Sequence, residues 1–133
     1  MNLNESAENY LETILILSRR LPVVRSVDIA TEMNFKKSSI SVAMKNLREN
    51  GYITVSEAGF ITLTKQGREI ADMIYERHTF LSDWLKSLGV NETTAAKDAC
   101  RMEHVISRES FSAIKQYVTN TGQKQCEKLS GNL

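Results

Sequence analysis

Three side chains of metal-binding type lie close together in the stretch DACRMEHVIS, residues 98–107. Glu103 and His104 follow Cys100 by three and four positions, so on a helix all three project from one face. A thiolate, a carboxylate and an imidazole together suit a divalent transition ion. The structural alternative is a small buried cysteine, a glutamate paired with a neighbouring base and a satisfied core histidine. This stretch alone leaves both interpretations open.

The only other histidine of the chain offers a further ligand for the same ion. His78 lies on a long predicted helix, and if that helix packs against residues 98–107, its imidazole can face the same point. Sulfur and nitrogen ligands with one carboxylate favour Fe²⁺, Co²⁺, Ni²⁺ or Zn²⁺, whereas Mn²⁺ prefers more oxygen. The residue types therefore indicate a transition-metal site.

The size of the chain limits what such a site can belong to. With 133 residues, 41% of them apolar, it forms one modest globular unit or two small ones sharing a long helix. No apolar run approaches the roughly 18 residues of a membrane span, and the first ten residues do not resemble a signal peptide. We expect a cytoplasmic protein without a membrane partner, in which Cys100 and Cys126 stay reduced.

The N-terminal third of the sequence is predicted to be helical. Residues 5–19 have apolar residues at near-helical spacing after Ser6, the expected N-cap. A short helix capped by Ser26 should end at Asn34, and the next, ended by Gly51, should be capped by Ser38 or Ser39. Two short helices joined by a tight turn indicate a helix-turn-helix.

Two β-rich runs follow at once, residues 52–55 and 60–63, separated by Ser-Glu-Ala-Gly. They predict a small hairpin. A helix-turn-helix followed by a hairpin is the order of a winged-helix DNA-binding domain, which is more specific than either part. We therefore predict a mainly α fold with a small β-hairpin wing, an N-terminal winged helix-turn-helix, and double-stranded DNA as the partner.

The charges agree with a DNA-binding role. Residues 19–50 contain seven basic and three acidic residues, although the whole chain has a net charge of only +1. Short polar and basic side chains at the start and exposed side of the third helix could reach base edges and phosphates. Alternatively, the serines only cap the helix and the lysines only solubilise it. The expected DNA-binding residues are Arg25, Lys36, Lys37, Ser38, Ser39, Ser41, Lys45 and Arg48.

The remaining sequence predicts helices that could form a dimer interface. A long helix should begin after Thr64, its cap, and end at Gly89, followed by helices at about 92–106 and 110–118. The apolar stripe of the long helix could pack partly in the core of its own chain and partly against a partner chain, which would give a homodimer. The stripe consists of Ile70, Met73, Ile74, Phe80, Leu81, Trp84, Leu85 and Leu88. The expected divisions are a winged domain, 1–63, a helical metal-binding dimerisation domain, 64–119, and a polar tail, 120–133.

Four motifs along the chain are the most specific parts of the sequence: ENYLETI, SSISVAMKNLRENGYI, LTKQGREIA and ACRMEHVIS. Through them the chain resembles, from about residue 4 to residue 118, the diphtheria toxin repressor family, which includes iron-dependent repressors and the manganese transport regulator. The resemblance implies a repressor of metal-ion homeostasis genes and not an enzyme. Its partners would be an operator and a second copy of the chain, without a small organic substrate. Its cofactor would be Fe²⁺ or Mn²⁺, which Co²⁺, Ni²⁺ or Zn²⁺ could replace.

The resemblance also implies a ligand set: Asn9, Glu12, His78, Cys100, Glu103 and His104. Glu12 matches a carboxylate that binds metal in the manganese members. Asn9 stands where those members have Asp and iron-type members have Met. Ser82 and Ala96 replace a Glu and a His of a second iron-type site.

An ion held by the first helix and by the later helices would tie the winged domain to the dimerisation domain. Two recognition helices could then enter successive major grooves about 34–36 Å apart, because the ion favours one arrangement of the dimer. Two alternatives stay open. One is a winged-helix regulator whose metal site has decayed, and the other is a small hydrolase whose zinc activates water.

Overall fold

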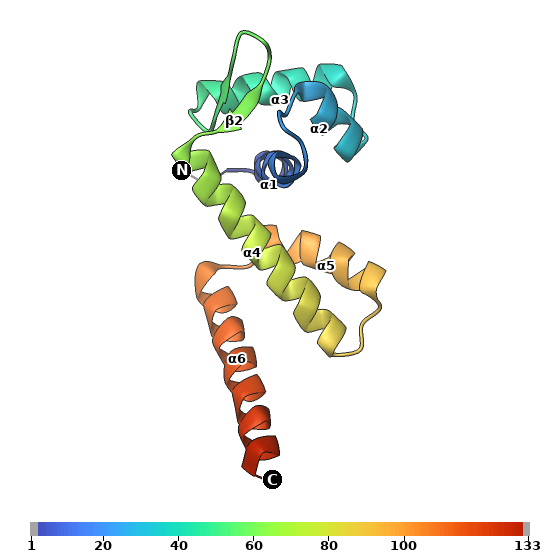
Figure 1. Cartoon of the computed structure of the whole chain (residues 1–133), viewed down its shortest axis with the longest axis vertical. Helices are drawn as coiled ribbons and strands as arrows, with labels where there is room; N and C mark the ends of the chain where they lie inside the picture. Colours follow the sequence, from blue (N-terminus) through green and yellow to red (C-terminus); the bar gives the residue numbers. More distant parts are fainter. Residues whose placement is uncertain (1–2, 132–133) are drawn as a thin grey trace. The chain divides into compact units, whose positions relative to one another are not determined.

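The computed structural model describes residues 3–131, and the side chains of residues 3–120. The described residues form six helices and two strands (Figure 1). In chain order they are α1 Glu5–Arg20, α2 Ser26–Met33, α3 Lys37–Glu49, β1 Ile53–Val55, β2 Ile61–Leu63, α4 Lys65–Ser87, α5 Glu92–Val105 and α6 Arg108–Gly131. The chain divides into two compact units after Tyr75, within α4. The predicted fold class, mainly α with one hairpin, is confirmed.

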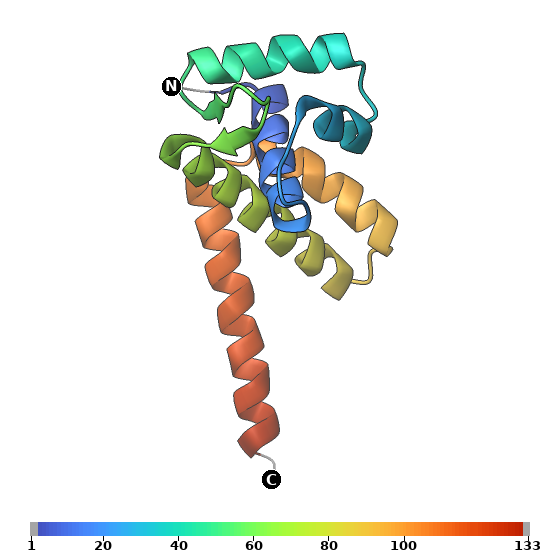
Figure 2. The ribbon, with the colours of Figure 1, turned by 45° about the horizontal axis from the view of Figure 1, so that its top comes forward.

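The first unit contains the predicted helix-turn-helix. The chain leaves α2 through Asn34, whose left-handed backbone (φ 56°) turns it sharply toward α3 (Figure 2). Asparagine tolerates this conformation better than most residues. The buried side chains of α3 are Ile40, Met44 and Leu47, and this spacing of three and four residues leaves the opposite face of the helix to solvent.

The helix caps differ from those predicted. Asn4, rather than Ser6, caps α1, with its side-chain oxygen accepting the Ala7 N–H at 2.8 Å. Helix α2 begins at Ser26 itself, after Arg25. Helix α3 begins at Lys37, so Ser38 and Ser39 lie inside its first turn and neither caps it. Asn and Ser are both good N-cap residues, so the sequence does not distinguish Asn4 from Ser6 before α1. Helix α3 instead follows Lys36, whose side chain makes no capping hydrogen bond.

The wing is an antiparallel pair in which Ile53 faces Leu63 and Val55 faces Ile61. Both strands start one residue later than predicted. Gly59, with φ 84°, occupies the left-handed position of the turn, and the Ser56 hydroxyl accepts the Phe60 N–H at 3.0 Å.

Hydrogen bonds join the wing to the rest of the first unit. The Ile61 N–H donates to the Val24 carbonyl at 2.8 Å, which ties β2 to the segment before α2. Thr64 caps α4 as predicted, because its hydroxyl accepts the Gly67 N–H at 3.1 Å and donates to the Gly51 carbonyl at 2.7 Å. Gly67 lies so close to Tyr52 that a Cβ there would be 2.0 Å from the Tyr52 carbonyl oxygen.

The second unit consists of the end of α4 with α5 and α6. Its core joins Leu81, Ala99 and Phe111, one residue from each helix. Phe80 meets the Phe111 ring edge-on, with ring centroids 5.5 Å apart. Gly89, with φ 96°, follows α4 as predicted.

The last helix is longer than predicted. A helix was expected at about residues 110–118, followed by a polar tail, whereas α6 extends from Arg108 to Gly131.

The described part of the chain has no helix both long and apolar enough to span a membrane.

Candidate metal centre and DNA-binding face

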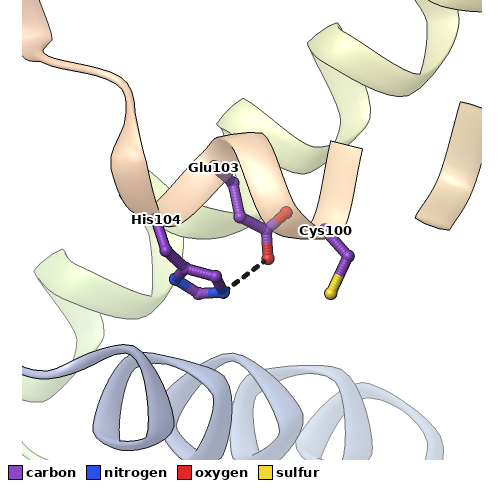
Figure 3. A group of neighbouring side chains, drawn as sticks. All are labelled: Cys100, Glu103 and His104. Carbon is purple, nitrogen blue, oxygen red and sulfur yellow. Dashed lines mark ion pairs between the residues drawn. The ribbon is translucent and has the colours of Figure 1, made fainter. Parts of the chain in front are cut away.

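The predicted metal-binding side chains of α5 project from the same side of this helix (Figure 3). One potential ligand atom from each of Cys100, Glu103 and His104 lies within 4.8 Å of the others. The helical period alone produces this grouping, because α5 runs unbroken to Val105. The structure therefore brings the triad together as expected.

Glu103 is the centre of the group. Its side chain is fully buried, and its Oε2 lies 2.8 Å from Nδ1 of His78 on α4. Its other oxygen, Oε1, lies 3.2 Å from Nε2 of His104, whose side chain is also buried. The α4 imidazole therefore contacts one member of the α5 triad, Glu103, whose carboxylate lies against two imidazoles from two helices.

A metal ion fits this group for a reason that the contacts themselves supply. Within the described part of the chain, Oε1 of Glu103 is buried and has no hydrogen-bond donor, since its contact with His104 lacks hydrogen-bond geometry. A buried carboxylate oxygen without a donor is costly unless a cation compensates it. The Cys100 thiol, the His104 imidazole and this carboxylate form a suitable donor set for a transition ion, and His78 contacts the other carboxylate oxygen.

The two other predicted ligands, Asn9 and Glu12, lie on α1 in the first unit. Glu12 is buried although α1 otherwise buries apolar side chains such as Leu11 and Ile14. Whether either residue binds the ion stays a prediction. Ser82, at a position where a second iron-type site would need a carboxylate, is buried in α4 and offers only a hydroxyl.

Sequence reasoning missed Arg77, which precedes His78 in α4. This arginine is buried, and its Nη1 donates to the Glu103 carbonyl at 3.1 Å and to the Ile106 carbonyl at 2.9 Å. No helical period could have revealed it, because its acceptors belong to the backbone of another helix.

The predicted DNA-binding residues are all exposed. Six lie on α3, and the other two, Arg25 and Lys36, immediately precede α2 and α3. A surface hollow of about 260 Å³ separates the start of α2 from the middle of α3 and contains both Lys45 and Arg48. Its lining is completed by Ser26, Ser41, Met44 and Val55. A hollow with two cations and two hydroxyls is suited to a phosphate.

Arg25 also contacts the wing. Its guanidinium carbon lies 4.9 Å from the centroid of the Phe60 ring, next to the start of β2. Its backbone N–H donates to the Asp28 carboxylate at 2.9 Å, which holds the residue at the start of α2. The wing is therefore joined to the helix-turn-helix through a cation–π contact as well as through the backbone.

Two family models cover most of the chain. Residues 2–59 match the N-terminal DNA-binding domain of the iron dependent repressors, and residues 64–128 match their metal-binding and dimerisation domain. The chain therefore belongs to the iron dependent repressor family, a class of metal-dependent, DNA-binding transcriptional regulators.

Relatives of similar length agree. The chain is 31% identical over 118 residues to the uncharacterized HTH-type transcriptional regulator MJ0568 of Methanocaldococcus jannaschii, covering 87% of this chain and 94% of that protein. It is 30% identical over 120 residues to the transcriptional regulator MntR of Escherichia coli O157:H7, covering 90% of this chain and 77% of MntR.

Solved structures have the same fold. A manganese-dependent transcriptional repressor in complex with manganese superimposes with a TM-score of 0.77 at 25% identity, over 85% of this chain and 52% of that chain. The manganese regulator SloR superimposes with a TM-score of 0.76 at 23% identity, over 90% of this chain and 55% of SloR. This chain thus spans about half the length of both solved chains.

Proposed function

We propose that this protein is a metal sensor that represses genes of metal-ion homeostasis by binding an operator as a homodimer. His78, Cys100, Glu103 and His104 hold one divalent transition ion. Asn9 and Glu12 of α1 are proposed as further ligands on the basis of the sequence. Since an operator-binding protein acts where the DNA is, the cytoplasm is the proposed location.

The observation that supports the proposal is the buried Glu103 carboxylate, with one oxygen bonded to His78 and the other lacking a hydrogen-bond donor within the described residues. Glu103 and His78 connect two helices of the second unit, so the site is built on rigid elements. A bound cation would supply positive charge beside this carboxylate. The chain's own residues orient the ligands and keep water from Glu103 and His104.

The ion itself is part of the proposal. The thiol of Cys100 and the two imidazoles favour Fe²⁺. Mn²⁺ is the second candidate, because the relatives named above include manganese-dependent repressors and Glu12 would add an oxygen. Anaerobic competition between Fe²⁺ and Mn²⁺ for the protein would rank the two ions directly.

The experiment that tests the site is an anaerobic Co²⁺ titration that follows thiolate-to-metal charge-transfer absorbance. Wild-type protein should show a stoichiometric band, and Cys100→Ser should abolish it. Thr94→Ser is the matched control, because Thr94 is exposed on the same helix and lies outside the triad. Binding without a band would remove the thiolate from the ligands and favour an oxygen-rich, manganese-type site. Absence of binding would refute the metal site.

A second titration tests the α1 ligands. Glu12→Gln keeps the shape of the side chain and removes its charge, so it should weaken metal binding if Glu12 is a ligand. Glu5→Gln is the control, because Glu5 is exposed at the start of the same helix. Equal affinities for the two variants would remove Glu12 from the ligand set and leave Asn9 as the remaining α1 candidate.

The coupling to DNA needs its own measurement. Operator affinity of the wild-type protein should fall when metal is removed with a chelator and return when metal is added. Equal affinity in both conditions would identify a metal-independent winged-helix regulator, which is the alternative function.

A further inference from the structure

Glu103 is held by two consecutive residues of α4. His78 contacts its carboxylate through Nδ1, at 2.8 Å from Oε2. Arg77 donates from Nη1 to the Glu103 backbone carbonyl at 3.1 Å and to the Ile106 carbonyl at 2.9 Å. One residue of α5 is thus bound at its side chain and at its backbone by neighbouring residues of another helix.

The Arg77 contacts lie at the C-terminal end of α5. The last carbonyls of a helix have no intrahelical donor, and a cationic side chain there satisfies them and interacts favourably with the helix dipole. Helix α5 ends at Val105, so Glu103 and His104 both lie in its last turn. Last turns fray unless they are capped, and fraying here would displace two proposed ligands together.

Burial of Arg77 is difficult to explain by stability alone. Its Nε is buried without a hydrogen-bond partner in the part of the chain that the structure describes. A well-packed apolar residue is often at least as stabilising as a buried, imperfectly satisfied charge. The guanidinium is instead held over the ring of Phe111, 5.6 Å from its centroid, which keeps Nη1 directed at the end of α5.

We propose that Arg77 is a positioning residue of the metal centre. It closes the last turn of α5 so that the Glu103 carboxylate and the His104 imidazole are held in place before the ion arrives. This inference rests on the proposed function for the identity of the ligand, whereas the ordering of the α5 turn is a property of the metal-free protein.

The test compares Arg77→Met, which keeps much of the apolar length, with Arg77→Lys, which keeps the charge and a single-point donor. Arg101→Met is the control, since Arg101 is exposed on the same helix as the ligands. Co²⁺ affinity should fall about ten- to a hundredfold in Arg77→Met, the range typical for residues that orient metal ligands. It should fall less in Arg77→Lys and remain unchanged in Arg101→Met.

Amide hydrogen exchange of the metal-free protein provides an independent readout. The Ile106 N–H, which donates to the Met102 carbonyl at 3.0 Å, should exchange faster in Arg77→Met than in wild type. Amides in the first half of α5 should keep their wild-type rates. Unchanged exchange at Ile106 would overturn the positioning role whatever the metal affinity.

General destabilisation is separated from positioning by Ala95→Gly, which weakens α5 in its buried first half without touching its end. If Ala95→Gly loses Co²⁺ affinity as strongly as Arg77→Met, Arg77 is only structural. If Arg77→Met does not fold, Arg77→Lys is measured instead. Co²⁺ affinity and Ile106 amide exchange equal to those of the wild type in Arg77→Lys would then overturn the proposal. If wild-type protein binds no Co²⁺, the proposed function fails, and Arg77 keeps at most the role of closing α5.

Discussion

His78 and Glu103 are 25 residues apart in sequence, and their side chains meet with Nδ1 of the imidazole 2.8 Å from Oε2 of the carboxylate. A carboxylate hydrogen-bonded to Nδ1 fixes the orientation of the imidazole ring and leaves Nε2 as the nitrogen directed away from the carboxylate. Only the imidazole of this pair reaches solvent, because the His78 side chain is 32% exposed and that of Glu103 is fully buried.

Replacing Glu103 by glutamine should remove metal binding. The amide keeps the shape and can still accept from His78, but it lacks the negative charge that faces the cation. We expect Co²⁺ affinity to fall by more than roughly 100-fold, beyond the usual effect of a residue that only orients ligands. Calorimetric titration measures this loss. Glu109→Gln on α6, at an exposed position, is the control, and equal affinities for the two variants would exclude Glu103 as a ligand.

Replacing Gly67 by alanine should destabilise the winged-helix unit. The new Cβ would lie 2.0 Å from the Tyr52 carbonyl oxygen, a backbone atom that also accepts the Thr64 N–H at 3.1 Å. Neither the Gly67 backbone nor the Tyr52 carbonyl can move without disturbing the contact between the wing and α4. We expect a loss of about 3 kcal/mol or more in the free energy of unfolding, measured by urea denaturation. Glu69→Ala, exposed on the same helix, should change it by less than about 0.5 kcal/mol.

Removing a lysine from the DNA-binding face should change how operator affinity depends on salt. Each phosphate that a cation neutralises contributes about 0.9 to the slope of log affinity against log salt concentration. Lys45→Ala should therefore reduce this slope by about 0.9, and Lys37→Ala by the same amount if it also contacts the backbone. Lys97→Ala, on an exposed part of α5, should leave it unchanged. A wild-type slope in Lys45→Ala would remove Lys45 from the interface.

Replacing Phe60 by leucine should weaken DNA binding without changing the salt slope. The substitution removes the ring that lies 4.9 Å from the Arg25 guanidinium, so the arginine keeps its charge and loses its orientation. A cation–π contact at an exposed site contributes about 0.5–1 kcal/mol, which corresponds to an affinity loss of about two- to fivefold. Fluorescence anisotropy at several salt concentrations gives both quantities. A reduced slope would mean that the aromatic ring was holding Arg25 directly on a phosphate.

The order of the elements was predictable from the sequence because each element is specified locally. Apolar spacing indicated α1, α3 and α4. The turn-forming residues Asn34 and Gly89 marked the ends of two helices, and the structure confirms both turns. Thr64 was likewise recognisable as a cap. The caps of α1 and α3 were not, because Asn4 and Ser6 are both capping residue types, and α3 follows Lys36, whose side chain makes no capping hydrogen bond.

By itself, the sequence determined that Cys100, Glu103 and His104 share one face, since the helical period alone requires it. It also determined the family, because the motifs along most of the chain match it. Only the tertiary structure decided that His78 contacts Glu103, that Arg77 closes the end of α5, and that Gly67 has no room for a Cβ beside Tyr52. The physical reason is distance along the chain: these contacts join residues of different elements, and nothing within either element encodes which of its faces will meet the other.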